Sequence, residues 1–219
     1  MKRKNLSTEI YELIVNNYTF EMPIFLQDVY ASFPSISQNS IRSVFKRFDE
    51  KEKVIKIKNG VYALPNQNSL MGKPTVYTSD IIKKKYLGDD KTIIGYKTGL
   101  NFANNLGLTT QTASVDSIIS NSVSNKKREI RLNNNRLIVN APRFKVSNEN
   151  YKLLQILDLL NEFERFSELE LKLASKNLLR YISDLRLDEE KVEKIVSCYP
   201  LEAQVKFYKI GGHNVIASK

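Results

Sequence analysis

The sequence is poor in the residues that build catalytic and metal centres. Its 219 residues include one cysteine, Cys198, one histidine, His213, and no tryptophan. One cysteine cannot form an internal disulfide, which favours a reducing compartment, the cytoplasm. One Cys and one His are also too few for a usual zinc site. We therefore expect no metal and no cofactor, and we expect Cys198 to pack as a small apolar side chain.

Long apolar runs and phosphate-cradling motifs are also absent from the sequence. No stretch approaches the ~20 apolar residues that span a bilayer, so we expect no membrane partner. Neither the Gly-x-Gly-x-x-Gly pattern nor the P-loop pattern occurs. The adjacent acids Asp89 and Asp90 point in different directions on a helix or turn, which makes them a poor metal clamp. We expect His213 to lie in a loose tail and the protein not to be an enzyme.

The chain has an excess of positive charge. It carries 34 Lys and Arg against 24 Asp and Glu, a formal net charge of +10, which favours a polyanionic partner. Residues 1–64 hold 10 basic and 7 acidic side chains, a balance of +3. Residues 65–150 hold 13 and 6, a balance of +7, and residues 151–219 hold 11 and 11, a balance of zero. The first two thirds are therefore the candidates for contact with nucleic acid.

An amphipathic helix is expected over residues 37–50. Ser37 is a suitable N-cap, and Ile41, Val44, Phe45 and Phe48 recur at i, i+3, i+4 and i+7. The opposite face is polar, basic and rich in amides. It carries Gln38, Asn39, Ser40, Arg42, Ser43, Lys46 and Arg47.

A hairpin is expected directly after this helix. Isoleucines alternate with lysines over residues 55–58, and Asn59 and Gly60 supply two positions that tolerate positive φ. Two further helices, over about residues 7–17 and 24–33, come first. This order is typical of a winged helix-turn-helix, in which the last helix enters the major groove and the hairpin lies on the backbone.

The expected fold class is α+β in two domains. The periodicity stops at residues 65–69, which separates a winged helix-turn-helix domain over residues 1–66 from a mixed α/β domain over residues 71–219. The second domain should contain a small antiparallel sheet, over about residues 93–146, and a helical part over residues 148–210.

Several local features are expected within the second domain. A lysine-rich helix over residues 80–87 should end at Gly88, and Asn residues 133–135 should form a hairpin turn. The last β-type run should contain Phe144 and Val146. Asn148 should cap a long helix that reaches about residue 166.

The stretch over residues 95–111 reads Gly-Tyr-Lys-Thr-Gly-Leu-Asn-Phe-Ala-Asn-Asn-Leu-Gly-Leu-Thr-Thr-Gln. Together with the helix and hairpin, it resembles the AbiEi family, the antitoxins of bacterial abortive-infection toxin–antitoxin pairs. Residues 107–111 are the most specific part of a resemblance that covers about residues 7–210 and is loosest after Asn148. Where family members often have a glycine before the wing, this chain has Glu-Lys-Glu-Lys at residues 50–53.

The resemblance implies a phage-defence antitoxin of type IV. Its N-terminal winged helix would bind inverted repeats in the operon's own promoter, as double-stranded DNA, and repress transcription. Its C-terminal domain would counteract a nucleotidyltransferase-like toxin without a stable complex. No heptad and no flat apolar strand edge indicates a dimer, so we expect a monomer that pairs on DNA through adjacent half-sites.

The expected contact residues form three groups. Amides pair with adenine and arginine with guanine, so base reading is assigned to Gln38, Asn39, Ser40, Arg42 and Ser43. Contact with phosphate is assigned to Lys46, Arg47, Lys56, Lys58 and Tyr62. A third surface, for antitoxicity or for nucleic acid, would comprise Lys83, Lys84, Lys85, Tyr96, Lys97, Gln111, Arg128, Arg131 and Arg136.

Alternatives to this interpretation stay open. The strongly basic middle region also fits an RNA- or protein-binding regulatory module that uses the winged helix as a platform. The lysine run at residues 83–85 also fits a solvated helix face. The stretch over residues 95–111 also fits a scaffold, with Gly99 and Gly107 at helix ends and its leucines in the core.

Overall fold

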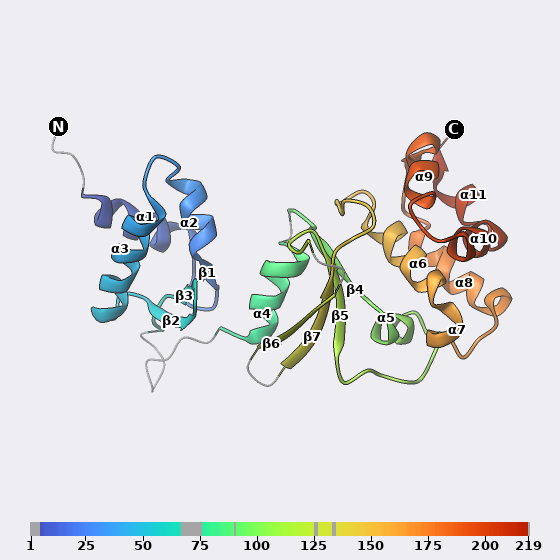
Figure 1. The fold of residues 1–219 in the computed structure, drawn as a ribbon, viewed down its shortest axis with the longest axis horizontal. Helices are drawn as coiled ribbons and strands as arrows, with labels where there is room; N and C mark the ends of the chain where they lie inside the picture. The colour runs from blue at the N-terminus through green and yellow to red at the C-terminus, as the bar shows by residue number, and fades with distance from the viewer. Residues whose placement is uncertain (1–4, 67–75, 90, 125–126, 133–134, 219) are drawn as a thin grey trace. The chain divides into compact units, whose positions relative to one another are not determined.

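The chain is α+β in the computed structural model, which describes residues 5–66, 76–89, 91–124, 127–132 and 135–218 (Figure 1). These residues form eleven α-helices, one π-helix and nine strands in three small sheets. The chain divides into two compact units, Met1–Ile81 and Ile82–Lys219. This division comes after the boundary expected at residues 65–69, of which 67–69 lie outside the described residues. No helix in the described ranges has the length and apolar character needed to cross a bilayer.

The first unit consists of three helices and a three-stranded antiparallel sheet. In chain order its elements are α1 (Leu6–Asn17), β1 (Ile24–Phe25), α2 (Leu26–Ser32), α3 (Gln38–Glu50), β2 (Ile55–Lys58) and β3 (Val61–Ala63). The strand order is β1-β3-β2. The expected helix over residues 37–50 is confirmed, with the Ser37 hydroxyl accepting from the Ser40 amide as its N-cap.

The apolar stripe of α3 forms the centre of the first unit's core. Ile41, Val44, Phe45 and Phe48 are all buried, as the helical spacing predicts. The Phe45 ring lies 4.8 Å from that of Tyr62 on β3, measured between centroids. This packing fixes α3 against the sheet and leaves its opposite face in solvent.

Three details of the first unit differ from expectation. Asn5 caps α1 by accepting from the Ser7 amide, so the helix begins at Leu6. The short strand β1 is an addition to the expected elements. Of the two turn residues, only Gly60 has positive φ, at 76°, and the β2–β3 register shifts at a bulge between Lys56 and Lys58. The expectation of a positive φ at Asn59 is therefore wrong. A bulge on β2, rather than a pair of positive-φ turn residues, accommodates the twist of the two strands.

The second unit contains a four-stranded mixed sheet. Its strands are β4 (Gly95–Thr98), β5 (Asp116–Ser120), β6 (Arg128–Leu132) and β7 (Asn135–Asn140), in the order β4-β5-β7-β6. The expectation of an antiparallel sheet is wrong, because β5 and β7 are parallel. The chain passes from β5 to the sheet edge as β6 and returns as β7 beside β5. The expected Asn turn between β6 and β7 falls on residues 133–134, outside the described residues.

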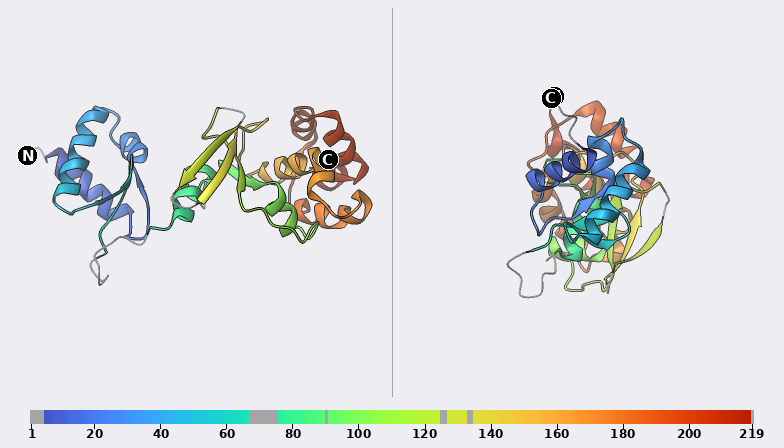
Figure 2. Two further views of the ribbon diagram at one scale, coloured as in Figure 1. Left: turned by 60° about the horizontal axis from the view of Figure 1, so that its bottom comes forward. Right: turned by 90° about the vertical axis from the view of Figure 1, so that its left-hand side faces the viewer.

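The remaining elements are mostly helices (Figure 2). They are α4 (Thr78–Ile82), the π-helix η1 (Lys83–Leu87), α5 (Leu100–Asn105), α6 (Tyr151–Asn161), α7 (Phe163–Phe166), α8 (Leu171–Ile182), β8 (Leu187–Asp188), α9 (Glu189–Val196), α10 (Leu201–Lys209), α11 (Gly212–Ile216) and β9 (Ala217–Ser218). The sheet separates two clusters of buried side chains. Tyr86, Ile118 and Val139 belong to one cluster, whereas Tyr96 and Ile119 belong to the core built with the C-terminal helices.

Two expectations for the segment before α6, a strand and a helix cap, are wrong, because asparagine side chains there make other hydrogen bonds. Phe144 and Val146 form no strand, because the amide and the carbonyl of Val146 are bonded to the Asn121 side chain at 3.0 and 2.9 Å. Asn148 caps no helix. Its side chain accepts from the Ile93 amide at 2.7 Å and donates to the Lys91 carbonyl at 2.7 Å, and α6 begins three residues later. Both asparagines tie the loop before α6 to the sheet.

The C-terminal end is more ordered than expected. Residues 212–216 form α11, and Ala217 and Ser218 pair in parallel with β8. His213 therefore lies on a helix, where its Nε2 is 3.5 Å from Glu193 Oε1. Cys198 is exposed rather than packed in the core, since it follows α9 in a solvent-facing turn.

Candidate nucleic-acid interface

The outer face of α3 exposes all the polar side chains assigned to it. These are Gln38, Asn39, Ser40, Arg42, Ser43, Lys46 and Arg47. They share one side of the helix because the apolar residues occupy the other at helical spacing. The face therefore presents amide, hydroxyl and cationic groups together.

Arg42 is held by α2 and by its own helix. Its Nε donates to Tyr30 Oη at 2.9 Å, and its Nη1 donates to Asn39 Oδ1 at 3.3 Å. The guanidinium carbon also lies 5.8 Å from the centre of the Tyr30 ring. A guanidinium has five N–H groups, so three remain for a ligand. Arg42 and Asn39 therefore act as an oriented pair.

The two serines of this face are bonded locally. Ser43 Oγ donates to the Asn39 carbonyl at 2.9 Å, and Ser40 Oγ lies 2.8 Å from Ser37 Oγ. Their hydroxyl oxygens can still accept a hydrogen bond. The serines can therefore support a contact, whereas the longer amide and guanidinium groups reach further from the helix.

The hairpin is tied to α3 through Asp49. The Lys56 amide donates to Asp49 Oδ1 at 2.9 Å, which couples β2 to the end of α3. The Lys56 side chain is exposed and that of Lys58 is half-buried. Lys46 lies 3.9 Å from Glu50, but both side chains are largely exposed, so this ion pair adds little stability.

The assignment of Tyr62 to phosphate contact is wrong. Its side chain is buried in the core against Phe45. Burial raises the pKa of the Tyr62 hydroxyl, with a further contribution from the Asp49 carboxylate. On β3, Tyr62 belongs to the core cluster that contains the apolar stripe of α3, whereas Val61 belongs to a second buried cluster with Phe25 and Ile81. Its role is to seat the hairpin on α3.

The third group of residues does not form one surface. Lys83, Lys84 and Lys85 lie on the π-helix, with Lys84 half-buried. Lys97 lies on β4 and pairs with Asp116 at 3.3 Å. On β6 and β7, the register places Arg131 opposite Arg136 on one face of the sheet, and Arg128 opposite Val139 on the other. Glu129 contacts both arginines of the first face, at 3.6 and 2.9 Å.

The assignment of Tyr96 to a contact surface is wrong because its side chain is buried, whereas Gln111 is exposed and stays a candidate for that surface. Tyr96 is buried and its hydroxyl donates to Asp158 Oδ2 at 2.5 Å. Gln111 Nε2 donates to Glu168 Oε1 at 3.1 Å. Sequence reasoning could not find these partners, because each lies about 60 positions further along the chain.

The stretch over residues 95–111 is a scaffold in this structure. A Cβ atom at Gly95 would lie 2.1 Å from the Tyr86 carbonyl oxygen and 2.5 Å from that of Ile119, so only glycine fits. Gly99 opens α5 with a φ of 75°. These glycines allow β4 to approach the π-helix and then turn into α5.

The end of this stretch donates several hydrogen bonds to the exposed carboxylate of Glu168. Thr109 Oγ1 donates to Glu168 Oε1 at 2.8 Å and the Thr110 amide donates to Oε2 at 3.2 Å. The Glu168 amide in turn donates to the Leu108 carbonyl at 2.8 Å. The bonds from Thr109 and Thr110 lower the pKa of the Glu168 carboxyl, so it stays ionised in this clasp.

A polar centre that the sequence analysis missed lies between β4 and α6. Burial raises the pKa of Asp158 to about 6, although the bond from Tyr96 and the charge of Arg143 act in the opposite direction. Gln155, one turn earlier on α6, donates to the Lys97 carbonyl at 2.7 Å and accepts from Tyr181 at 2.6 Å. An Asp and a Gln within the leucine-rich run of residues 153–160 were the available signal.

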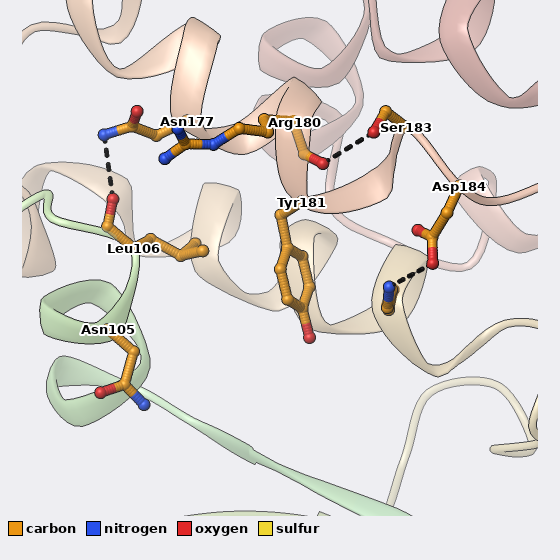
Figure 3. Close-up of a pocket in the computed structure, with 8 residues that line it drawn as sticks. Asn105, Leu106, Asn177, Arg180, Tyr181, Ser183 and Asp184 are labelled. Carbon is orange, nitrogen blue, oxygen red and sulfur yellow. Dashed lines mark hydrogen bonds and ion pairs between the residues drawn. The ribbon is translucent and has the colours of Figure 1, made fainter.

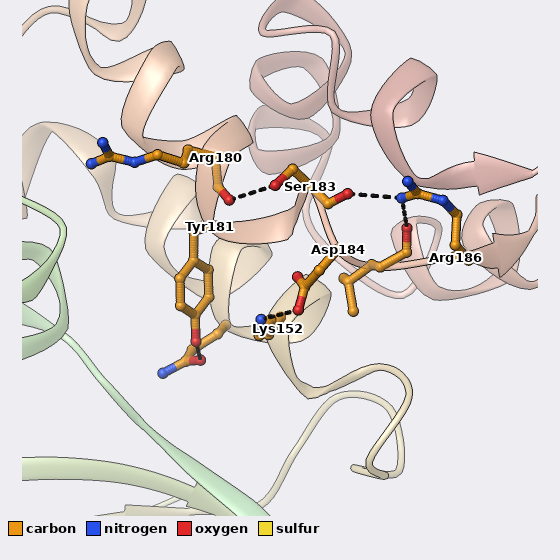
Figure 4. A network of polar contacts seen from close by, with 8 residues as sticks. Lys152, Arg180, Tyr181, Ser183, Asp184 and Arg186 are labelled. Carbon is orange, nitrogen blue, oxygen red and sulfur yellow. Dashed lines mark hydrogen bonds and ion pairs between the residues drawn. The ribbon is translucent and has the colours of Figure 1, made fainter.

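The second unit has a polar hollow of about 450 Å³ beside α8 (Figure 3). It is lined by Asn105, Leu106, Lys152, Asn177, Arg180, Tyr181, Ser183 and Asp184. Lys152 pairs with Asp184 at 2.5 Å, and Asn177 donates to the Leu106 carbonyl at 3.0 Å. Arg186 extends this network to the Ser183 carbonyl at 2.8 Å (Figure 4). Most of these polar groups satisfy one another, which is typical of a structural network.

A smaller hollow of about 190 Å³ lies in the first unit, between the start of α1 and the end of α3. It is lined by Asn5, Ser7, Arg47, Phe48, Lys51 and Lys53. Across the part of the chain that the structure describes, no three His, Cys, Asp or Glu side chains are grouped to hold a metal ion.

Comparison with known proteins places the chain in a family. No curated protein matches the sequence. A family model described as a family of unknown function, DUF6088, matches residues 18–145. This match includes α2, α3, the hairpin and the sheet of the second unit, and it covers more than half of the 219 residues. The chain therefore belongs to the DUF6088 family.

Proposed function

We propose that the first unit is a winged helix-turn-helix that binds double-stranded DNA, with α3 in the major groove and the β2–β3 hairpin against the backbone. The observation that carries this proposal is the α3 face, on which Arg42 is oriented by Tyr30 and Asn39. A preoriented guanidinium loses less rotamer freedom when it binds the edge of a guanine. The order of helices and strands and the antiparallel hairpin also support it.

The proposed base contacts come from the first two turns of α3. Gln38 and the Asn39–Arg42 pair are the longest polar groups there. Asn39 uses its amide oxygen to hold Arg42, so a bidentate contact of Asn39 with adenine would require Arg42 to release it. The pair therefore fits a guanine under Arg42 better than an adenine under Asn39.

The proposed phosphate contacts are Lys46, Arg47, Lys56 and Lys58. They lie on the later turns of α3 and on β2. The hydrogen bond from the Lys56 amide to Asp49 links these two elements. Such contacts set the register of a protein on the duplex without reading sequence. We propose that they hold α3 in position over its operator, an inverted repeat in the promoter of the chain's own operon.

We further propose that the second unit is the antitoxin half of an abortive-infection pair. This part is supported by the resemblance of residues 95–111 to the AbiEi family, which the chain's membership of DUF6088 leaves open. Because most of that stretch is scaffold, the antitoxic surface is sought among exposed basic residues of the same unit. Lys85, Lys97, Arg131 and Arg136 are exposed and are the first candidates.

A second candidate function is RNA binding through the second unit. The cross-strand pair of Arg131 and Arg136, with Glu129 as a shared partner, favours it, because it places two guanidinium groups on one sheet face. A reader of RNA shape would ignore operator sequence and require the 2′-hydroxyl.

A promoter fusion tests the proposed repression in cells. The DNA upstream of the gene drives a reporter, and the full chain is supplied from a separate plasmid. We expect repression by the wild-type chain and its loss with Arg42→Ala at equal protein level. Arg180→Ala, an exposed arginine of the second unit, is the matched control and should repress fully. Equal reporter output with and without the chain would refute repression.

Growth tests the antitoxin half. Co-expression of the full chain with the nucleotidyltransferase-like toxin encoded beside it should restore growth, and Arg42→Ala should not abolish that rescue. Unchanged toxicity in the presence of the chain would refute the antitoxin proposal.

A further inference from the structure

The hollow between α1 and α3 has the composition of an anion site. Three of its lining residues, Arg47, Lys51 and Lys53, are cationic, and none is acidic. Its volume of about 190 Å³ lies below the ~300–1,000 Å³ of sites for organic ligands, so it suits a single small group. Asn5 and Ser7, at the start of α1, also line the hollow, and the Asn5 side chain accepts from the Ser7 amide, so the charge of the hollow comes from its three cations.

The local fold holds two of these cations, Arg47 and Lys53, beside the hollow. Arg47 Nε donates weakly to the Ser43 carbonyl at 3.4 Å. After α3 the chain turns back at Glu52, whose φ is 54°, and the Lys53 amide donates to the Phe48 carbonyl at 2.8 Å. The Lys53 ammonium then lies 4.7 Å from the centre of the Tyr11 ring. This cation–π contact holds the charge beside α1 without neutralising it.

The hollow lies on the side of α3 away from the hairpin. Each residue of an α-helix turns by about 100°, so Arg47 and Asp49 project about 200° apart. Asp49 is bonded to β2 through the Lys56 amide, whereas Arg47 lines the hollow. The helix therefore has a basic hairpin on one flank and a basic hollow on the other.

We propose that this hollow binds a backbone phosphate of DNA, on the strand opposite to the one contacted by the hairpin. The proposal rests on the proposed function of α3 as the groove-reading helix. A helix in the major groove has one phosphate backbone on each flank, and this unit offers cations on both. The two flanks together clamp the duplex across the groove.

The test compares the full chain with its Lys51→Gln/Lys53→Gln variant. Lys172→Gln/Lys176→Gln removes the same charge from exposed positions on α8 and is the matched control. Duplex affinity is measured over a series of salt concentrations. We expect the slope of log affinity against log salt to fall by roughly one for the first variant, because the hollow would neutralise one phosphate and each neutralised phosphate contributes roughly one, and to stay unchanged for the control.

Phosphate ethylation interference then identifies the strand. We expect the Lys51→Gln/Lys53→Gln variant to lose interference on one strand and to keep it on the strand that faces the hairpin. An unchanged slope together with an unchanged interference pattern would overturn the proposal. Inorganic phosphate that binds the wild-type chain but not the variant, while duplex binding is equal in both, would also overturn it and assign the hollow to a free anion.

Two further measurements distinguish this proposal from an effect on packing and from failure of the repressor proposal. Lys53→Arg should retain the salt slope, and thermal unfolding should show that the variants are folded, so a lower slope reports charge rather than packing. If the wild-type chain has no preference for its own upstream DNA, the repressor proposal fails. The salt slope on random duplex would still decide whether the hollow contacts phosphate.

Discussion

Single side chains on α3 differ in how firmly the fold holds them. Arg42 is bonded to Tyr30 and Asn39, whereas Lys46 has only a loose pair with Glu50 at 3.9 Å. The helical spacing of the apolar residues predicted which residues of α3 face solvent, and the structure confirms that. It could not predict that Tyr30, twelve positions earlier, orients Arg42, because that contact depends on how α2 and α3 pack.

The first residue-scale prediction concerns Arg42. Arg42→Ala should weaken binding to the operator by about 1–3 kcal/mol and should relax sequence preference at one position. Tyr30→Phe keeps the ring but removes the hydroxyl that accepts from Arg42 Nε, so it should cause a smaller loss of the same kind. Competition titrations with single-base operator variants measure both effects. An equal loss on operator and random DNA would argue against base reading by Arg42.

The second residue-scale prediction concerns Asp158. Its pKa in the folded chain is raised to about 6, from an ordinary 3.8, because burial disfavours the charged form. Folding therefore favours protonated Asp158: its contribution to stability is full below pH 3.8 and is lost as the pH rises through about 6. Asp158→Asn removes this titration and keeps an acceptor for Tyr96.

Denaturant unfolding of the wild-type chain and of Asp158→Asn, from roughly two pH units below the folded pKa to roughly two above it, measures the pH dependence of stability that Asp158 contributes. Relative to Asp158→Asn, the wild-type chain should lose about 3 kcal/mol of unfolding free energy across this range. Parallel stability curves for the two proteins would contradict the assignment.

Helices with a clear apolar period were predictable as elements, and their connections were not. The apolar stripe over residues 37–50 predicted the bounds of α3 to within one residue. Its members Ile41, Val44, Phe45 and Phe48 are all buried, as expected. Strand β1 has two residues, too few for any period to show. The parallel pairing of β5 with β7 depends on which strands meet in space, and adjacent hairpin-like runs gave no sign of it.

The π-helix is a further example at the element scale. The sequence predicted one helix ending at Gly88, and Gly88 does follow it, with a φ of 107°. The change from α4 to the wider turn over Lys83–Leu87 brings Tyr86 into the core beside Ile118. Helical propensity alone does not distinguish the two kinds of turn, because the tertiary contact of Tyr86 decides between them.

The element-scale prediction concerns the clasp around Glu168. Glu168→Ala removes the acceptor for Thr109, the Thr110 amide and Gln111, and should lower the melting temperature of the second unit. Glu170→Ala, an exposed glutamate two residues later, is the matched control and should change stability little. Hydrogen exchange at the Thr110 amide should accelerate in the first variant only. Equal exchange and equal melting temperatures in the two variants would show that the clasp contributes nothing.

At the scale of the whole molecule, charge and composition indicated a binding protein, and the structure divides that chain into two compact units. The positive charge of the middle region is spread over the π-helix, β4 and both faces of the β6–β7 corner. A charge count could not reveal this distribution, because it depends on strand register. The basic hollow beside α3 was missed for the same reason, since Lys51 and Lys53 appear in the sequence only as part of a charged loop.

The central claim is that this chain reads DNA sequence through α3. The most direct measurement is the ratio of affinities of the full chain for the DNA upstream of its own gene and for random duplex at physiological salt. We predict a ratio of ~10³ or more, the low end for specific DNA-binding proteins, and a sharp drop in that ratio for Arg42→Ala. Equal, weak and strongly salt-dependent binding to both DNAs would contradict the claim and would leave RNA binding by the second unit as the leading function.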